Sequence, residues 1–169
     1  MRKLEEVQEA RALMTEAMDW SVFRWLFEKS RVREIADQAN AALDASERAV
    51  KARWSGEVRA AYKNLTAKSS KAARKGQKDP KPEQTLDPAI LALIEKVRHA
   101  DAAAEQAHLD AENTFDEAER QLNTAMAREG CNKAIHSWTL HEKAIRKAEA
   151  VTDALRDQTV ASSPSRAEQ

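Results

Sequence analysis

Apolar residues recur alternately four and three positions apart through the second half of the chain. The series consists of Ile90, Ile94, Val97, Asp101, Ala104, His108, Ala111, Phe115, Ala118, Leu122 and Ala125. This spacing is the a/d seam of a heptad repeat and predicts one long helix that presents a stripe to a partner helix. Beyond Gly130 the stripe resumes out of phase, so we expect an irregularity near that glycine.

The first half of the chain carries a stripe of similar spacing, made of Leu4, Val7, Met14, Met18, Trp25, Val32, Ile35, Ala39, Ala42, Ser46 and Ala49. Between the two stripes, glycine and three prolines within residues 69–88 interrupt the helical pattern. Asp87 followed by Pro88 is a favourable helix start, because Asp accepts N–H bonds and Pro has no N–H to leave unpaired. The predicted organisation is a first helical arm (1–74), a basic Pro/Gly hinge (75–88), a second helical arm (89–158) and a disordered tail (159–169).

Two arms of matched length predict an all-α fold, in the form of a long antiparallel helical hairpin that resembles a coiled coil. If the chain folds back near residue 80, position i lies close to position 161 − i. Asp101 then lies opposite Arg59, and this polar pair in the seam would set the alignment of the arms. The alternative is a three- or four-helix bundle, with breaks at Asp19-Trp20-Ser21 or at Gly130. A seam rich in alanine buries little apolar surface, so we expect additional burial through oligomerisation.

The segment from residue 20 to residue 27 holds more apolar side chains than one seam can bury, because they point around the whole circumference of a helix. The hairpin register brings it against Trp138. We interpret the surplus as a docking surface for a second copy or another protein, made of Trp20, Phe23, Trp25, Leu26, Phe27 and Trp138. A core closed within the chain is the alternative. The favoured function is accordingly that of a non-enzymatic coiled-coil scaffold, adaptor or assembly subunit.

The charges of the chain balance overall, but not in every region. The chain has 28 basic and 28 acidic residues, so net charge favours neither nucleic acid nor membrane as a partner. Around the hinge, however, basic residues predominate, and a tip of this kind could bind a polyanion such as nucleic acid. The candidate residues are Lys68, Lys71, Arg74, Lys75, Lys78 and Lys81. A solvated basic loop is the more ordinary interpretation, and polyanion binding is kept as the alternative function.

The sequence also bears on cellular location. The N-terminal residues lack the apolar core of a signal peptide. No apolar run reaches the roughly 18 residues of a membrane span. Cys131 is the single cysteine, so it has no partner within the chain for a disulfide. We expect a soluble cytoplasmic protein, with secretion without a leader left open.

Little in the sequence points to catalysis. Glu105 and His108 form an E-x-x-H pair of the kind found in di-iron bundles, but a second pair is missing. Cys131 and His136 are close in sequence, which is not the geometry of a catalytic pair. Phosphate-binding and nucleophile-elbow motifs are also missing. We therefore expect neither enzymatic activity nor a cofactor or metal site.

One short motif suggests a further alternative. Trp54-Ser55-Gly56, followed by Ala60, Ala61 and Tyr62, resembles the W-x-G turn of small helical hairpin proteins that type VII systems export. The resemblance implies a bend at the motif and a secretion-associated function. The chain departs from that family because the motif lies in a strongly helical stretch, and because the C-terminal tyrosine-plus-acid export signature is missing. A secretion-associated hairpin is therefore the second alternative function.

Overall fold

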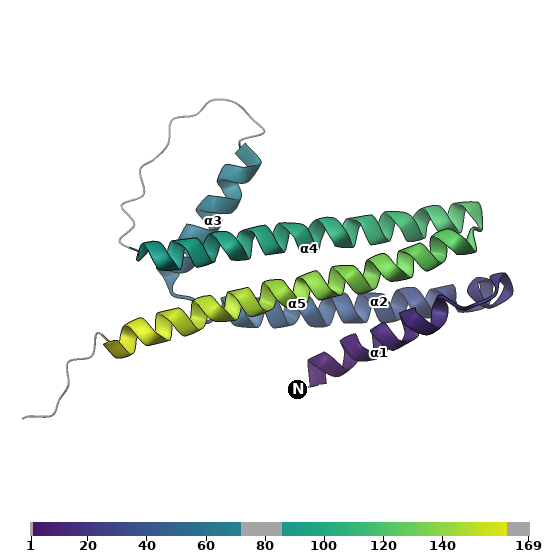
Figure 1. Cartoon of the computed structure of the whole chain (residues 1–169), viewed down its shortest axis with the longest axis horizontal. Coiled ribbons are helices and arrows are strands. Elements are labelled where there is room, and N and C mark those ends of the chain that lie inside the picture. Colours follow the sequence, from purple (N-terminus) through teal and green to yellow (C-terminus); the bar gives the residue numbers. More distant parts are fainter. Residues whose placement is uncertain (1, 72–85, 162–169) are drawn as a thin grey trace, which may run out of the picture.

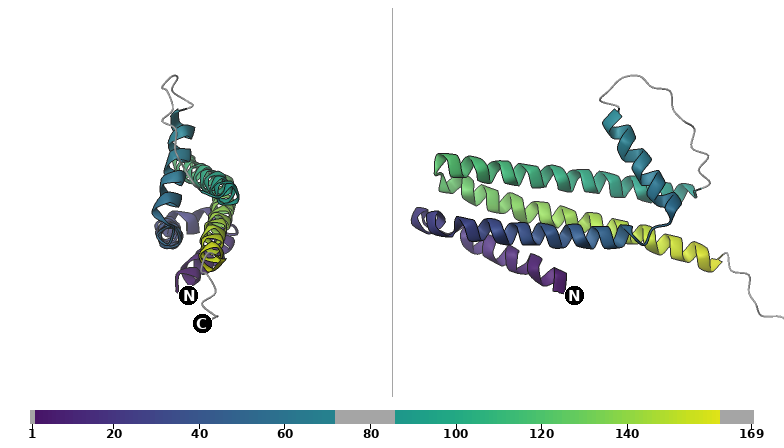
Figure 2. Two further views of the ribbon diagram at one scale, coloured as in Figure 1. Left: turned by 90° about the vertical axis from the view of Figure 1, so that its left-hand side faces the viewer. Right: turned by 180° about the vertical axis from the view of Figure 1, so that it is seen from behind.

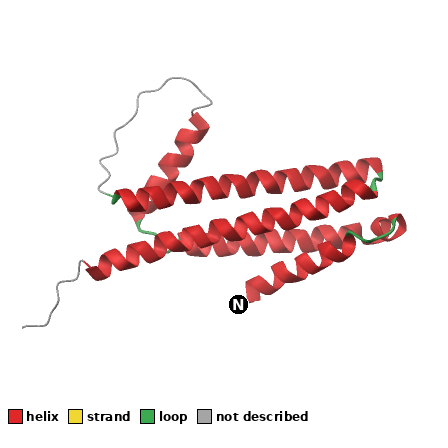
Figure 3. Cartoon of the chain, in the orientation of Figure 1, coloured by secondary structure: helices red, strands yellow, loops and turns green. Residues whose placement is uncertain are grey.

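The computed structural model describes residues 2–71 and 86–161, and within these ranges every regular element is a helix. The helices are α1 (Arg2–Ala17), α2 (Val22–Lys51), α3 (Gly56–Lys71), α4 (Pro88–Gln121) and α5 (Thr124–Ala161). Short turns join α1 to α2, α2 to α3 and α4 to α5 (Figure 3). The prediction of an all-α fold is confirmed.

Two of the helix starts follow from local chemistry. Ser21 caps α2, and its hydroxyl accepts from the backbone N–H of Arg24 at 3.4 Å. Asp87 caps α4, accepting from the N–H of Ala89 at 2.7 Å, with Pro88 in the first turn. Both residues satisfy donors that have no partner inside a helix. The expected opening of the second arm at Asp87-Pro88 is thus confirmed.

The second arm folds back on itself at Leu122. This residue ends α4 with φ 49° and ψ 42°, a left-handed conformation that is uncommon outside glycine. Asn123 then caps α5, because its side-chain oxygen accepts from the N–H groups of Ala125 at 3.0 Å and Met126 at 3.3 Å. The irregularity of the second arm therefore lies at Leu122, whereas Gly130, where it was predicted, is inside α5.

The helices form a bundle in which α4 and α5 share the largest interface (Figure 1). They run antiparallel, so a helical hairpin exists, but within the second half of the chain. Helix α2 lies alongside α5 and parallel to it, as the contacts of Asn40 with Trp138, of Glu47 with His141 and of Trp54 with Ala148 show. Helix α1 lies along α2 and α5, and the chain reverses direction between α1 and α2 at the break at residues 18–21 (Figure 2).

The register in which position i faces position 161 − i is therefore wrong, and the bundle alternative, with its break near Trp20, describes the arrangement. The physical reason is burial. An alanine stripe buries little surface against one neighbour, whereas in the bundle α5 packs against α1, α2 and α4 at once. The bundle thus supplies additional burial from within the chain, and burial through oligomerisation stays a prediction.

Helix α3 leaves the direction of the bundle and packs on the first turns of α4 (Figures 1 and 2). Its inward residues join a second core, separate from the main one, whose members are Val50, Trp54, Val58, Ala61, Ile90, Ile94, Val97, Ala148 and Val151. Trp54 anchors this core by donating from its indole Nε1 to the carbonyl oxygen of Ala148 at 3.2 Å. Among the helices described, none has both the length and the apolar composition needed to cross a bilayer.

Two glycines differ sharply in their surroundings, which leads to a prediction about stability. A Cβ atom at Gly130 would lie 2.9 Å from Cδ1 of Phe115, whereas nothing lies within 4 Å of a Cβ at Gly56. Gly130→Ala gains about 1 kcal/mol of helix propensity but has to displace a packed ring, which costs about 1–3 kcal/mol. We expect urea unfolding to show a net loss for Gly130→Ala and a neutral or slightly stabilising effect for Gly56→Ala. A Gly130→Ala variant more stable than the wild type would contradict the contact with Phe115.

Candidate protein-docking surface

The first turns of α2 distribute their apolar side chains around the helix, as the sequence indicated. Trp25 points inward and is 8% exposed. Val22 and Leu26 flank it and are about half exposed, while Phe23 and Phe27, one helical turn apart, are 75% and 85% exposed. Each residue turns the helix by about 100°, so one stripe enters the core and the remainder is left uncovered.

Leu122, in the turn between α4 and α5, extends this surface across to the neighbouring helices and is 65% exposed. We call Val22, Phe23, Leu26, Phe27 and Leu122 the end patch. Large apolar side chains that are exposed singly are ordinary, but a contiguous group is typical of an interaction site.

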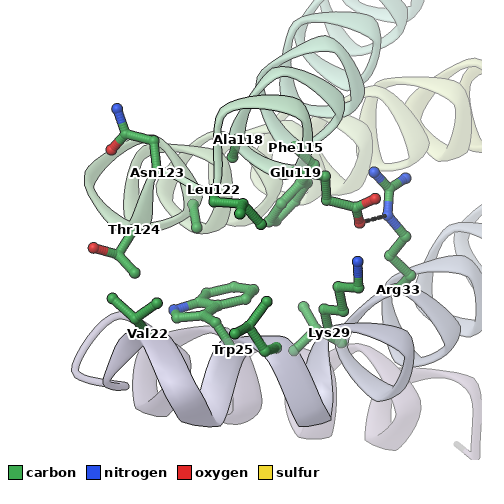
Figure 4. Close-up of a pocket in the computed structure, with 13 residues that line it drawn as sticks. Val22, Trp25, Lys29, Arg33, Phe115, Ala118, Glu119, Leu122, Asn123 and Thr124 are labelled. Carbon is green, nitrogen blue, oxygen red and sulfur yellow. Dashed lines mark hydrogen bonds and ion pairs between the residues drawn. The ribbon is translucent and has the colours of Figure 1, made fainter.

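A small pocket opens between α2 and the α4–α5 turn (Figure 4). Trp25 and Val22 on α2 face Phe115 on α4 and the residues Leu122 and Thr124 at the α4–α5 turn. Most of the side chains that line the pocket are apolar. Its volume of about 50 Å³ is far below the roughly 300–1,000 Å³ of ordinary small-molecule sites. The pocket could therefore receive part of one apolar side chain and is too small for a cofactor.

Ion pairs fix the helices on either side of this pocket. Arg33 of α2 donates to Asp116 and to Glu119 of α4, at 2.7 Å in each case. Burial alone would lower the pKa of Arg33, but these two hydrogen bonds raise it above its ordinary value. Lys29 lies at the mouth of the pocket (Figure 4). Charged side chains thus border the apolar pocket on one side.

The three tryptophans predicted in the docking surface are buried in the protein's own core. Trp20 is 2% exposed and meets Trp25 edge-to-face with ring centroids 5.5 Å apart. Trp138 is 1% exposed and donates from Nε1 to Oδ1 of Asn40 at 2.8 Å. The alternative of a core closed within the chain therefore describes the tryptophans. Of the predicted docking residues, Phe23, Leu26 and Phe27 stay accessible.

The predicted seam pair of Arg59 and Asp101 is not formed. Asp101 pairs instead with Nζ of Lys51 at 2.6 Å and accepts a hydrogen bond from the hydroxyl of Tyr62. Arg59 is exposed, because α3 diverges after Trp54 and turns this residue outward. Burial raises the pKa of Asp101, although Lys51 and Tyr62 oppose that shift. Burial and the neighbouring Asp101 carboxylate also raise the pKa of Tyr62, to about 12.

The basic candidates remain untested. Arg74, Lys75, Lys78 and Lys81 lie outside the described residues. Lys68 and Lys71 belong to α3, which points away from the bundle (Figure 1), and their side chains are outside the described set. Binding of a polyanion by these residues stays a prediction.

The residues considered for catalysis or metal binding do not come together in the described part of the chain. His108 contacts Glu112 at 3.3 Å, one helical turn away, and Glu105 is exposed. Cys131 is fully buried, and burial raises the pKa of its thiol to about 12, so it stays protonated at neutral pH. A protonated, inaccessible thiol is neither a nucleophile nor a metal ligand.

A group that the sequence did not suggest lies between α2 and α5. Nε2 of His141 is 2.6 Å from Oε2 of Glu47 and 3.9 Å from Oδ1 of Asp44. Glu47 also forms an ion pair with Lys51, one turn further along α2. The i, i+3 spacing of Asp44 and Glu47 was visible in the sequence, but His141 could join them only once α2 and α5 were known to run parallel.

The W-x-G resemblance is matched in part. A turn over residues 52–55 separates α2 from α3, so the chain does bend at Trp54-Ser55-Gly56, in a stretch where the sequence predicts continuous helix. Tyr62 packs edge-to-face against Trp54 with ring centroids 5.7 Å apart. However, α3 packs on α4 and not back along α2, so these two helices do not form the implied hairpin. The secretion-associated function stays a prediction.

Comparison of the chain with known proteins adds no relative: no family model, curated protein or solved structure matches it. What the described residues offer at the end of the bundle is a set of uncovered apolar side chains beside a narrow pocket with a charged rim. Such an arrangement can bury apolar surface against another macromolecule.

Proposed function

We propose that the protein is a non-enzymatic helical scaffold or assembly subunit that binds another protein through the end patch. The observation that carries this proposal is the exposure of Phe23 and Phe27 at 75% and 85% on one face of α2. Aromatic rings dominate the energetics of protein interfaces because each buries a large rigid surface at little entropic cost. Here two such rings, in a helix held at its start by the Ser21 cap, contribute nothing to the protein's own core.

A second copy of the chain is the partner that this surface fits best. The start of α2 carries protruding rings on one face and, on the face toward α4 and α5, a pocket that is lined by Trp25, Leu26 and Phe115 and can accept an apolar group. A bundle end that carries both a projection and a recess can pair with a second copy, so that an apolar group of one copy enters the recess of the other. The charged rim around Arg33 would then lie at the polar edge of the interface.

Sedimentation of Phe27→Ser tests this proposal. The wild-type chain is expected to associate reversibly as its concentration rises. Removing a ring at the centre of an interface typically costs about 2 kcal/mol or more, and the substitution removes one ring from each copy, so the dissociation constant should rise by roughly 30-fold per ring, or about 1,000-fold in all. Because Phe27 touches little of its own chain, urea unfolding of the variant should agree with wild type within about 0.5 kcal/mol.

Leu109→Ser is the matched control, because Leu109 is also an exposed apolar residue, at 45%, but lies on α4 away from the end patch. It should leave association unchanged. A wild-type chain that stays monomeric at all attainable concentrations, or equal losses for Phe27→Ser and Leu109→Ser, would contradict self-association through the patch.

A further inference from the structure

Asp44, Glu47 and His141 direct three oxygen and nitrogen donors at one point between α2 and α5. The donor atoms all lie within 4.8 Å of one another. The two carboxylates are three residues apart and therefore share a face of α2, while the imidazole comes from the neighbouring helix. We propose that these residues form a binding site for a divalent first-row transition-metal ion, for which Zn²⁺ is the best match.

The distances suit such an ion. Zinc binds nitrogen and carboxylate oxygen at about 2.0–2.2 Å with tetrahedral angles, which places neighbouring ligand atoms about 3.3 Å apart. The two distances from Nε2 of His141 are 2.6 Å to Glu47 and 3.9 Å to Asp44, one shorter and one longer than this value. Small side-chain rotations would equalise them without moving either helix.

The charge of the surroundings also favours a cation. Glu47, Asp44 and Asp101 carry three negative charges, and Lys51 supplies one positive charge to Glu47 and Asp101. With Arg48 also counted, the carboxylates still exceed the bases by one, so the local charge is negative and favours a cation. Arg48, the nearest other base along α2, donates to the main-chain oxygen of Asp44 at 3.3 Å and so leaves its carboxylate available.

The neighbours of the ligands orient them. Lys51 binds Oε1 of Glu47, which leaves Oε2 directed at His141. Outer partners of this kind hold a ligand in the orientation that the metal requires.

The donor set indicates the class of ion. Imidazole nitrogen suits zinc and the neighbouring transition metals, whereas Mg²⁺ and Ca²⁺ prefer oxygen alone. The side chain of Asp44 is 63% exposed, so the fourth position opens to solvent and would be occupied by water. With three ligands and an open position, the site is expected to bind an exchangeable ion.

Calorimetric titration of the tag-free full-length chain with ZnCl₂, and visible absorption on adding CoCl₂, test the proposal. The wild type should bind one equivalent, and the Co²⁺ complex should show the intense bands of tetrahedral coordination. Asp44→Asn should reduce the affinity by roughly 10- to 100-fold, the range found even for changes to outer partners. Because Asp44 is mostly exposed, this variant should keep its fold, which circular dichroism would verify.

His108→Ala is the matched control, since His108 also lies against a carboxylate, that of Glu112, at 3.3 Å. It should bind Zn²⁺ as the wild type does, while His141→Gln should not. Equal affinities for Asp44→Asn and wild type, or loss on His108→Ala instead, would show binding elsewhere on the surface and overturn the proposal. The outcome is independent of self-association through the end patch, because the two sites share no residue.

Discussion

Trp138→Ala should lower the free energy of unfolding by about 3–5 kcal/mol, the cost of removing a large buried ring and leaving a cavity. Trp138 is 1% exposed and belongs to the main core, to which α1, α2, α4 and α5 all contribute. Its loss would also leave Oδ1 of Asn40 without the indole donor at 2.8 Å. Urea unfolding followed by far-UV circular dichroism measures the effect. Because small domains are stable by only about 5–15 kcal/mol, the variant should be near its folding limit.

Two further variants separate the contributions of Trp138. Trp138→Phe keeps most of the apolar burial and removes the hydrogen bond, so it should cost clearly less than the alanine variant. Leu109→Ala, at an exposed apolar position, should change the free energy of unfolding by no more than about 0.5 kcal/mol. A loss below about 1 kcal/mol for Trp138→Ala would contradict the burial of Trp138 between α2 and α5.

Lys51→Met is expected to cost about 3–5 kcal/mol, because it leaves two largely buried carboxylates without their shared cation. Lys51 binds Asp101 at 2.6 Å and also pairs with Glu47, and its Nζ lies 4.4 Å from the centre of the Tyr62 ring. The side chains of Lys51 and Asp101 are 19% and 16% exposed, so water can replace little of the lost interaction. Equilibrium unfolding in urea at neutral pH measures the loss.

Arg33→Met is the matched comparison, since Arg33 also bridges two acids, Asp116 and Glu119, but at the surface. Exposed ion pairs contribute about 1 kcal/mol or less, so this variant should be far milder than Lys51→Met. In Lys51→Met, adding Asp101→Asn should recover part of the loss, because it removes one unpaired charge. If Lys51→Met and Arg33→Met lower the free energy of unfolding by the same amount, the Lys51 network is not shielded from solvent.

The same network predicts how stability depends on pH. The folded-state pKa of Glu47 is about 2, below its ordinary value of 4.5, so its contribution is present above pH 4.5 and lost as the pH falls towards 2. The pKa of Asp101 is raised, so protonation of Asp101 acts in the opposite direction and offsets part of this loss. The urea midpoint of the wild type should fall across this window, and Glu47→Gln should flatten the fall. An identical slope in Glu47→Gln would contradict the assignment.

Local features were decided by the sequence alone. Helix formers and apolar spacing predicted the all-α fold, and Asp87-Pro88 marked the start of α4, because both depend on residues within one or two turns. The surplus of apolar side chains around residues 20–27 was also visible in the sequence, and part of it is exposed, while its role in docking stays a prediction. Trp25 and Phe27 are two residues apart and therefore lie on opposite sides of α2. When the stripe that contains Trp25 enters the core, Phe27 is left uncovered.

Only the tertiary structure decided how the helices pair. A heptad stripe through Leu122 is compatible with one long helix or with two that fold back, and the reversal depends on a left-handed residue and on the Asn123 cap. The parallel contact of α2 with α5, which joins Glu47 to His141, follows from burial shared among several helices and not from any one stripe. Partner choice between stripes of equal spacing is a long-range property, because each stripe can bury its apolar surface against several others at similar free energy.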